Sequence, residues 1–415
     1  MLALNGGKPL RTAPWPAWPE HDDAEARALE RVVKSGRWGG FPAPGPEAVK
    51  FGEAFARYVG SRHAVLAANG TVTLKVALRA MQIGAGDEVI VPALTWIATA
   101  GCAAYVNAVP VFADIDPDSL CIDPRSVESL ITPRTRAVIC VHLGSAMADL
   151  DALTELCQRR NLKLIEDCAH AHGMRWRDRG AGSIGDAGSF SFQSSKLLTA
   201  GEGGAITTSS DELMQRCQSL VNCGRKDAHY AAFEGPNLGW NDRITELQAG
   251  LLSAQLLRLD DQHRRRAVNL AHFEKRLAEL GDIGLVPQRR DPRITRPTFY
   301  QLVLTYDAKK WKGLSRDRFV AALEAEGVPA DGGFYVPIPD RVGEIFPLTA
   351  REYPEIRARY GERLEPSQVS VPVASRAAYE RTVWLHHPLF LGTTRDVDDL
   401  AEAIIKVREG IDELL

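Results

Sequence analysis

Two short phrases of the sequence carry side chains that could do chemistry together. Asp167 follows an apolar run in LIEDCAHAHG, and Lys196 lies in a loop of small residues in SFSFQSSKLLTAGEGGA. Alone, an Asp after a buried strand is more often a helix cap or a neighbour of a metal or phosphate, and a loop lysine is usually a solvated charge. The two residues lie 29 positions apart. This leaves room for a strand and its connections, so both side chains can face one crevice at the ends of parallel strands.

A lysine amine facing a carboxylate is the pair that pyridoxal phosphate (PLP) chemistry requires. The amine binds the cofactor as a Schiff base and later moves a proton, while the carboxylate keeps the pyridine nitrogen protonated so that the ring draws electrons. An opposite charge nearby favours the ionised carboxylate by about 1–3 pKa units. The sequence therefore predicts Lys196 and Asp167 as a catalytic pair that uses PLP and no metal.

Further positions could hold the rest of such a cofactor. Gly70 and Thr71, in AANGTVTLKVAL, precede a helix-like run, and amides at a helix start bind phosphate readily. A turn followed by an N-cap threonine is an equal alternative. Ser191 and Gln193, on the strand that leads to the lysine, could add hydroxyl and amide contacts to the same phosphate. Trp96, in VPALTWIATA, could lie flat on the pyridine ring or simply pack in the core.

The pattern of apolar runs predicts the elements that position these residues. Between about Asp87 and Asp167, the strand-like runs EVIVP, VPVFADI, RAVICVHL and LKLIEDC alternate with helix-like segments, as in a parallel sheet covered on both faces. GSFSF and GGAITT read as further strands. We expect an α/β fold with an N-terminal arm at 1–24, a large domain at 25–257 and a smaller α+β domain at 258–415, entered through a helix from about Thr245 and closed by a helix at 397–414.

Composition excludes several classes of protein. The net charge of -3, from 50 basic and 53 acidic residues, gives no reason to expect nucleic acid or an anionic membrane as partner. The start MLALNGGKPLRT lacks the apolar region of a secretory signal, and no stretch supplies about 18 uninterrupted apolar residues. Seven cysteines without a CxxC pair indicate reduced, mostly buried thiols. We expect a cytoplasmic protein.

Over nearly its whole length the chain resembles the DegT–DnrJ–StrS-type sugar aminotransferases, which aminate keto-sugars and keto-cyclitols. The resemblance runs from ALNGGKP and GDEVIVPALTW through EDCAHAHG, SFSFQSSK and TAGEGGA to GWNDRITELQAG and TVWLHHP. It implies a PLP-dependent transferase of fold type I, as in aspartate aminotransferase, with a large, mostly parallel sheet. It also implies that Lys196 binds PLP, Asp167 meets the pyridine nitrogen, Trp96 stacks on the ring, and Gly70, Thr71 and Ser191 hold the phosphate.

Two positions carry further implications of the resemblance. Asn241, in GWNDRITE, matches an asparagine that reaches the phosphate of the neighbouring subunit, which implies a homodimer with shared active sites. His170 stands where most members have glutamine, although the aminohydroxybenzoate synthases of the group also have histidine, and it should contact PLP.

The resemblance also suggests substrates. PALTWIATA, VNAVPVF, CIDP and VHLGSAMADLDAL are most similar to the scyllo-inosose and 2-deoxy-scyllo-inosose aminotransferases of aminoglycoside biosynthesis. This implies a keto-cyclitol acceptor and L-glutamine, or L-glutamate, as donor. The alternatives are a nucleotide-linked keto-sugar aminotransferase and an enzyme like the aminohydroxybenzoate synthases. Dehydrating relatives replace the lysine with histidine, and a non-catalytic sensor would need neither Lys196 nor Asp167.

Overall fold

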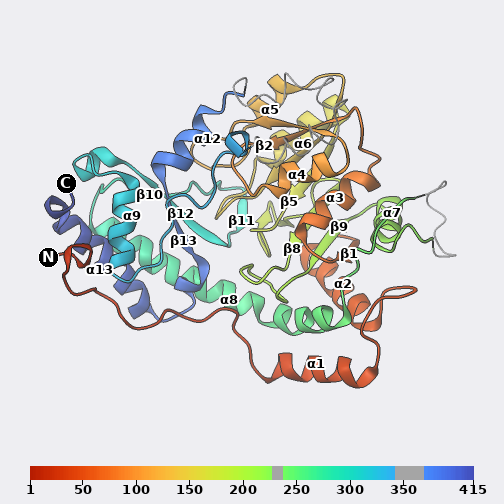
Figure 1. Ribbon diagram of the computed structural model, residues 1–415, viewed down its shortest axis with the longest axis horizontal. Helices are drawn as coiled ribbons and strands as arrows, with labels where there is room; N and C mark the ends of the chain where they lie inside the picture. Colours follow the sequence, from red (N-terminus) through yellow and green to blue (C-terminus); the bar gives the residue numbers. More distant parts are fainter. Residues whose placement is uncertain (227–236, 342–368) are drawn as a thin grey trace.

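A seven-stranded sheet forms the centre of the larger part of the molecule (Figure 1). The computed structural model describes residues 1–226, 237–341 and 369–415. Five neighbouring strands of the sheet are parallel, and one further strand is antiparallel to both of its neighbours. In sheet order the strands are β1 (His63–Ala67), the antiparallel β9 (Gly204–Thr208), β8 (Ala187–Ser191), β5 (Lys163–Asp167), β4 (Thr135–Val141), β2 (Glu88–Pro92) and β3 (Val109–Ala113). The predicted α/β fold with a large, mostly parallel sheet is confirmed.

Helices between the strands explain why the strand sequences are apolar throughout. Every residue of β2, β3 and β8 is buried, as expected for strands covered on both faces. Helix α3 packs against α4 and α7, and α5 packs against α6. The helices are α3 (Gly70–Ala80), α4 (Ala98–Tyr105), α5 (Pro124–Leu130), α6 (Leu150–Arg160) and α7 (Asp211–Val221).

A smaller antiparallel sheet, in the order β10-β12-β13, forms the centre of the other part of the molecule. Its apolar core includes side chains of α9 and α13. The bounds are β10 (Leu285–Pro287), β12 (Gln301–Tyr306), β13 (Thr382–His386), α9 (Arg316–Ala325), α12 (Pro372–Arg376) and α13 (Thr394–Glu409). A third sheet contains β11 (Ile294–Arg296), β6 (Arg175–Trp176) and β7 (Arg179–Gly180). The final helix thus begins and ends earlier than predicted, because it stops before Gly410 and only a short 3-10 turn follows.

The long helix α8 (Glu246–Glu279) connects the two parts and runs along both of them in Figure 1. Thr245 caps it in a capping box with Gln248, so the predicted helix start is confirmed. Helices α1 (Asp23–Ser35) and α2 (Pro46–Val59) pack on α8. Because α8 continues across positions 257 and 258, the domain boundary proposed there stays a prediction.

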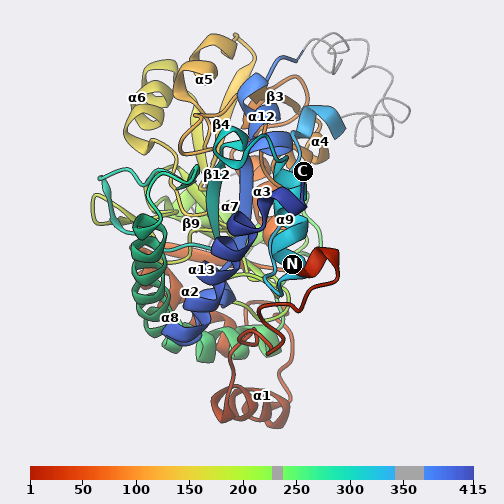
Figure 2. The same cartoon turned by 90° about the vertical axis from the view of Figure 1, so that its left-hand side faces the viewer.

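The two ends of the chain lie together on the smaller part (Figure 2). The backbone amide of Leu2 donates to the Glu413 carboxylate at 2.8 Å. Glu326, which precedes the turn after α9, accepts from the amides of Ala3 and Leu10. The N-terminal arm is therefore tied to the C-terminal part by hydrogen bonds.

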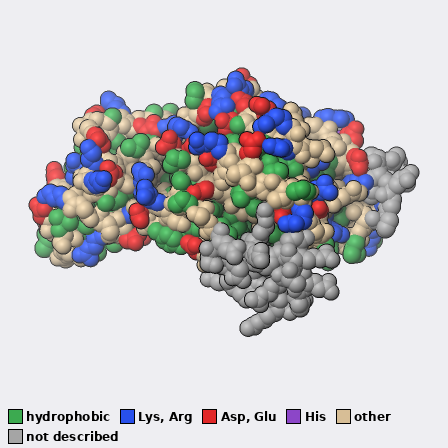
Figure 3. Space-filling model, turned by 90° about the horizontal axis from the view of Figure 1, so that it is seen from above, with side chains coloured by type: hydrophobic (Ala, Val, Ile, Leu, Met, Phe, Trp, Pro, Cys, Tyr) green, Lys and Arg blue, Asp and Glu red, His purple; other side chains and the backbone are tan. Residues whose placement is uncertain are grey.

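The surface carries mixed charges. Basic and acidic side chains are interspersed over the face seen in Figure 3. Six of the seven cysteines are buried, only Cys223 is exposed, and all seven are unpaired. None of the described helices is long and apolar enough to span a bilayer.

Candidate active site

The strand ends bring the predicted lysine and aspartate into one cavity of about 760 Å³. Asp167 is the last residue of β5, and Lys196 follows the end of the parallel neighbour β8. Eight of the nine site residues predicted from the sequence line this cavity: Gly70, Thr71, Trp96, Asp167, His170, Ser191, Gln193 and Lys196. The cavity thus lies at the carboxyl ends of parallel strands, where open α/β sheets usually bind their ligands.

Asp167 is a buried carboxylate with few compensating contacts. The Thr99 hydroxyl donates to Oδ2 at 3.0 Å, and the Ala169 amide donates to Oδ1 at 3.2 Å. Burial raises the pKa of Asp167, while the two hydrogen bonds and the nearby Lys196 only partly oppose it. A cation placed against this carboxylate would favour its ionised form. The protonated pyridine nitrogen of PLP is such a cation.

Lys196 has an amine suited to proton transfer near neutral pH. Burial lowers the pKa of Lys196 to about 8, although Asp167 opposes the shift. The Nζ atom lies 4.1 Å from the centre of the Tyr300 ring. The uncharged amine, which is the nucleophilic form, is therefore much more populated than in an exposed lysine.

Distant segments hold the loop that carries the lysine. The Gln193 Oε1 atom accepts from both the amide and the hydroxyl of Ser195. Trp18 donates to the carbonyl of Ser194, and His387 Nε2 donates to that of Ser195 at 3.1 Å. Because the amide of Gln193 serves this loop, its predicted phosphate contact stays a prediction.

The start of α3 forms the predicted phosphate loop. Asn69 caps the helix by accepting from the Val72 amide at 3.0 Å. The amides of Gly70 and Thr71, in the first turn, have no partner within the helix. A Cβ atom at Gly70 would lie only 2.6 Å from the Ser191 Cβ, so glycine is what allows α3 and β8 to approach each other here. This helix start and Ser191 fit the phosphate of PLP, and Asp167 fits its pyridine nitrogen.

Trp96 and Tyr105 both line the cavity. Trp96 is 56% exposed and Tyr105 is 72% exposed. The alternative of simple core packing for Trp96 is therefore wrong. Its predicted stacking on the cofactor ring stays a prediction.

His170 is buried between aromatic side chains. The Gly144 amide donates to Nδ1 at 3.3 Å, Nε2 lies 3.0 Å from the Tyr335 hydroxyl, and the His170 and Tyr300 ring centres are 4.2 Å apart. Burial, and to a lesser degree Lys196, lowers the pKa of His170 well below its usual range. The ring is therefore neutral. His170 lines the cavity, and its predicted contact with PLP stays a prediction.

Sequence reasoning missed Tyr300 and Tyr335, which both line the cavity. Each lies more than 100 residues after Lys196, in TFYQLVLTY and GGFYVP, and no spacing links these phrases to the lysine loop. The one available signal was a tyrosine hydroxyl within a run that is otherwise apolar, since such a hydroxyl usually finds a partner when buried.

Asn241 is the one predicted site residue that does not line the cavity. It is exposed, and it forms an isolated bridge with Asn222. Its neighbour Asp242 pairs at 2.8 Å with Lys75, which does line the cavity. The prediction that Asn241 reaches the site of a second subunit therefore remains a prediction.

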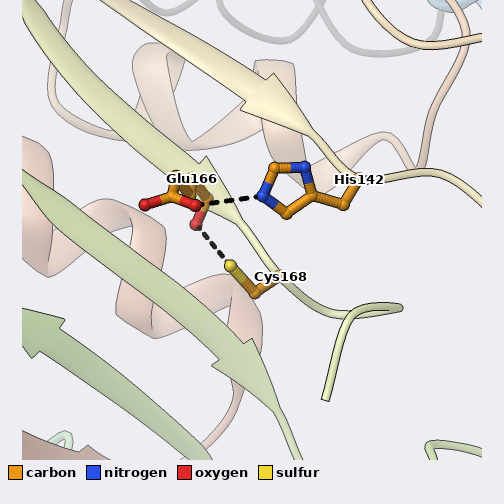
Figure 4. A group of neighbouring side chains, drawn as sticks. All are labelled: His142, Glu166 and Cys168. Carbon is orange, nitrogen blue, oxygen red and sulfur yellow. Dashed lines mark hydrogen bonds and ion pairs between the residues drawn. The ribbon is translucent and has the colours of Figure 1, made fainter. Parts of the chain in front are cut away.

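Next to Asp167, a buried group of His142, Glu166 and Cys168 has side chains of types that bind metals (Figure 4). The Glu166 carboxylate already accepts from His142 and from the backbone amides of three residues, Gly182, Ile184 and Gly185. The Ala148 amide donates to His142 Nδ1 at 3.2 Å, so Nε2 carries the proton that is donated to Glu166. Burial raises the pKa of Glu166, but His142 and the amides outweigh it and the pKa is lowered. The group therefore acts as a hydrogen-bonded anchor for β5.

Known proteins match both the sequence and this geometry. A profile of the DegT/DnrJ/EryC1/StrS aminotransferase family matches residues 19–403. A protein of Streptoalloteichus tenebrarius, provisionally named L-glutamine:3-amino-2,3-dideoxy-scyllo-inosose aminotransferase, is 47% identical over 100% of this chain and 99% of its own length. The L-glutamine:2-deoxy-scyllo-inosose aminotransferase of Streptomyces fradiae is 42% identical, with 99% and 98% covered. The crystal structure of a 3-amino-5-hydroxybenzoic acid synthase superposes with a TM-score of 0.81 at 33% identity, over 95% of this chain and 99% of that one.

Proposed function

Because the chain belongs to the DegT/DnrJ/EryC1/StrS aminotransferase family, we propose that it uses PLP to move an amino group from L-glutamine to the ketone of a cyclitol. The observation that carries the proposal is full-length similarity, at 47% and 42% identity, to proteins named for this donor and for inosose acceptors. The sequence of the 3-amino-5-hydroxybenzoic acid synthase is less similar, at 33% identity.

The residues in the cavity suit the two halves of an amino transfer. When bound, PLP supplies the electron sink and carries the amino group between donor and acceptor. Asp167 would hold the pyridine nitrogen protonated, and the amides of Gly70 and Thr71 would bind the phosphate. The Lys196 amine, with a pKa of about 8, can take a proton from the carbon of the bound donor and return one to the carbon of the acceptor.

The charges of the cavity disfavour an acceptor that carries a diphosphate. Among the described residues that line it, the only lysines are Lys75 and Lys196, and there is no arginine. Lys75 is paired with Asp242 at 2.8 Å. A nucleotide-linked sugar carries a diphosphate, which usually requires Arg or Lys side chains, whereas the hydroxyls of a cyclitol need neutral hydrogen-bond partners.

The site also suits a homodimer with shared active sites. Trp96 and Tyr105 line the cavity and are exposed, and Trp240 beside Asn241 is 52% exposed. Large exposed apolar side chains of this kind often mark an interface between proteins. Asn241 of one subunit would then complete the phosphate site of the other.

A panel of ketones tests the acceptor. Purified enzyme is given L-glutamine, or L-glutamate for comparison, with scyllo-inosose, its 2-deoxy analogue, the 3-amino-2,3-dideoxy analogue or a nucleotide-linked keto-sugar. We expect one of the cyclitols to be aminated at least about a hundredfold more efficiently than the nucleotide sugar, a ratio within reach of specific polar contacts. The opposite preference would replace the cyclitol with a nucleotide-linked sugar.

A further inference from the structure

The hydrogen bonds around His170 determine where its single proton lies. A backbone amide can only donate, so the bond from Gly144 makes Nδ1 an acceptor. A neutral imidazole carries one N–H, which must then be at Nε2. The Nε2–H group therefore donates to the Tyr335 hydroxyl oxygen, 3.0 Å away.

The two tyrosines of the cavity differ in where their own hydrogens point. The amide of Ser195 fixes the Gln193 Oε1 atom as an acceptor, and the Ser195 hydroxyl donates to the same atom at 2.7 Å. The Tyr300 hydroxyl, 2.7 Å from Ser195 Oγ, must therefore donate to that atom, so its hydrogen is already engaged. Tyr335 accepts from His170 instead, so its hydrogen is available to another acceptor.

Tyr335 is a phenol rather than a phenolate. Burial raises the pKa of Tyr335 well above its usual range, with smaller contributions from Tyr300 and Asp167. The side chain is only 8% exposed, and it lines the same cavity as Lys196. At neutral pH it is therefore a hydrogen-bond donor held in the wall of the site.

We propose that His170 is a positioning residue, which turns the hydroxyl hydrogen of Tyr335 into the cavity so that it donates to a neutral oxygen of the cyclitol acceptor. This inference rests on the proposed function. A phenol suits a ketone or hydroxyl oxygen, whereas the carboxylate of the amino donor is better matched by a cation. His170 thus contributes to the recognition of the acceptor without touching it.

Four variants of the holoenzyme test this role: Tyr335→Phe, His170→Met, the double variant, and His170→Gln. Glutamine can accept from Gly144 through Oε1 and donate to Tyr335 through Nε2, whereas methionine can do neither. Tyr379→Phe is the matched control, because its hydroxyl bonds Asp340 on the surface, away from the residues that line the cavity. For each variant we measure the KM for 2-deoxy-scyllo-inosose and, with L-glutamine alone, the rate at which the cofactor absorbance band is lost.

We expect Tyr335→Phe and His170→Met each to raise the KM for the ketone by about 3- to 10-fold, the loss typical of one neutral hydrogen bond. The KM of His170→Gln should stay within about twofold of the wild-type value. The KM of the double variant should not exceed that of the more impaired single variant, because His170 acts through Tyr335. The proposal is overturned by any one of three outcomes: the losses of the two single variants add up in the double variant, His170→Gln fails to restore the KM of wild type, or the reaction with L-glutamine alone slows as much as the KM for the ketone rises. A wild-type enzyme that reacts with L-glutamine but aminates no cyclitol overturns the proposed acceptor as well, and this is seen before any variant is compared.

Discussion

Removing the cofactor should leave Lys196 as an unusually reactive amine. Burial lowers the pKa of Lys196 from 10.5 to about 8. At pH 7 about a tenth of the side chains would then be uncharged, roughly 300-fold more than for a lysine with a pKa of 10.5. Since only the uncharged amine attacks the aldehyde of PLP, this difference predicts selective labelling of Lys196.

The assay follows this reaction as a function of pH. Apoenzyme is mixed with PLP between pH 6 and 10, quenched early with borohydride, and digested to quantify the labelled peptides. We expect the initial rate for the Lys196 peptide to rise with a half-point near pH 8. Asp167→Asn should move the half-point to lower pH, because the carboxylate raises the pKa of Lys196. Lys275→Ala, an exposed position on α8, is the control and should change nothing.

Three results would refute the reasoning. A half-point at pH 10 or above would mean that burial does not lower the pKa of Lys196. A label that is mainly on another lysine would remove the assignment of Lys196. A half-point that moves to higher pH in Asp167→Asn would mean that the carboxylate does not stabilise the charged amine.

Two further predictions concern the phosphate site. Gly70→Ala should weaken PLP binding by about tenfold in a fluorescence titration, because the added Cβ meets the Ser191 Cβ at 2.6 Å. The control is Gly101→Ala, which should bind PLP normally because nothing lies within 4 Å of a Cβ at that position. Unchanged binding in Gly70→Ala would show that the close approach to Ser191 does not matter. If active sites are shared, mixing inactive Lys196→Ala with inactive Asn241→Ala subunits should restore part of the activity through hybrid dimers that contain one intact site. No recovery in a sample shown to exchange subunits would argue that each site is complete within one chain.

The sequence by itself determined the local features of this protein. Apolar runs separated by helices predicted β2 to β5 as parallel strands, because a strand covered on both faces must be apolar along its whole length. Asp167 ends one apolar run, and Lys196 lies in a loop after another apolar run. These positions predicted that the two residues share a crevice. Both residues line the same cavity.

Only the tertiary structure decided which distant residues complete the site. Tyr300 and Tyr335 reach the cavity through the path of the chain after α8, and hydrophobic periodicity reports whether a residue is buried but not which segment buries it. The lowered pKa values of Lys196 and His170 depend on the same distant segments, because desolvation is set by everything packed around a group. The proton on His170 Nε2 likewise follows from the Gly144 amide, a partner that the sequence does not reveal.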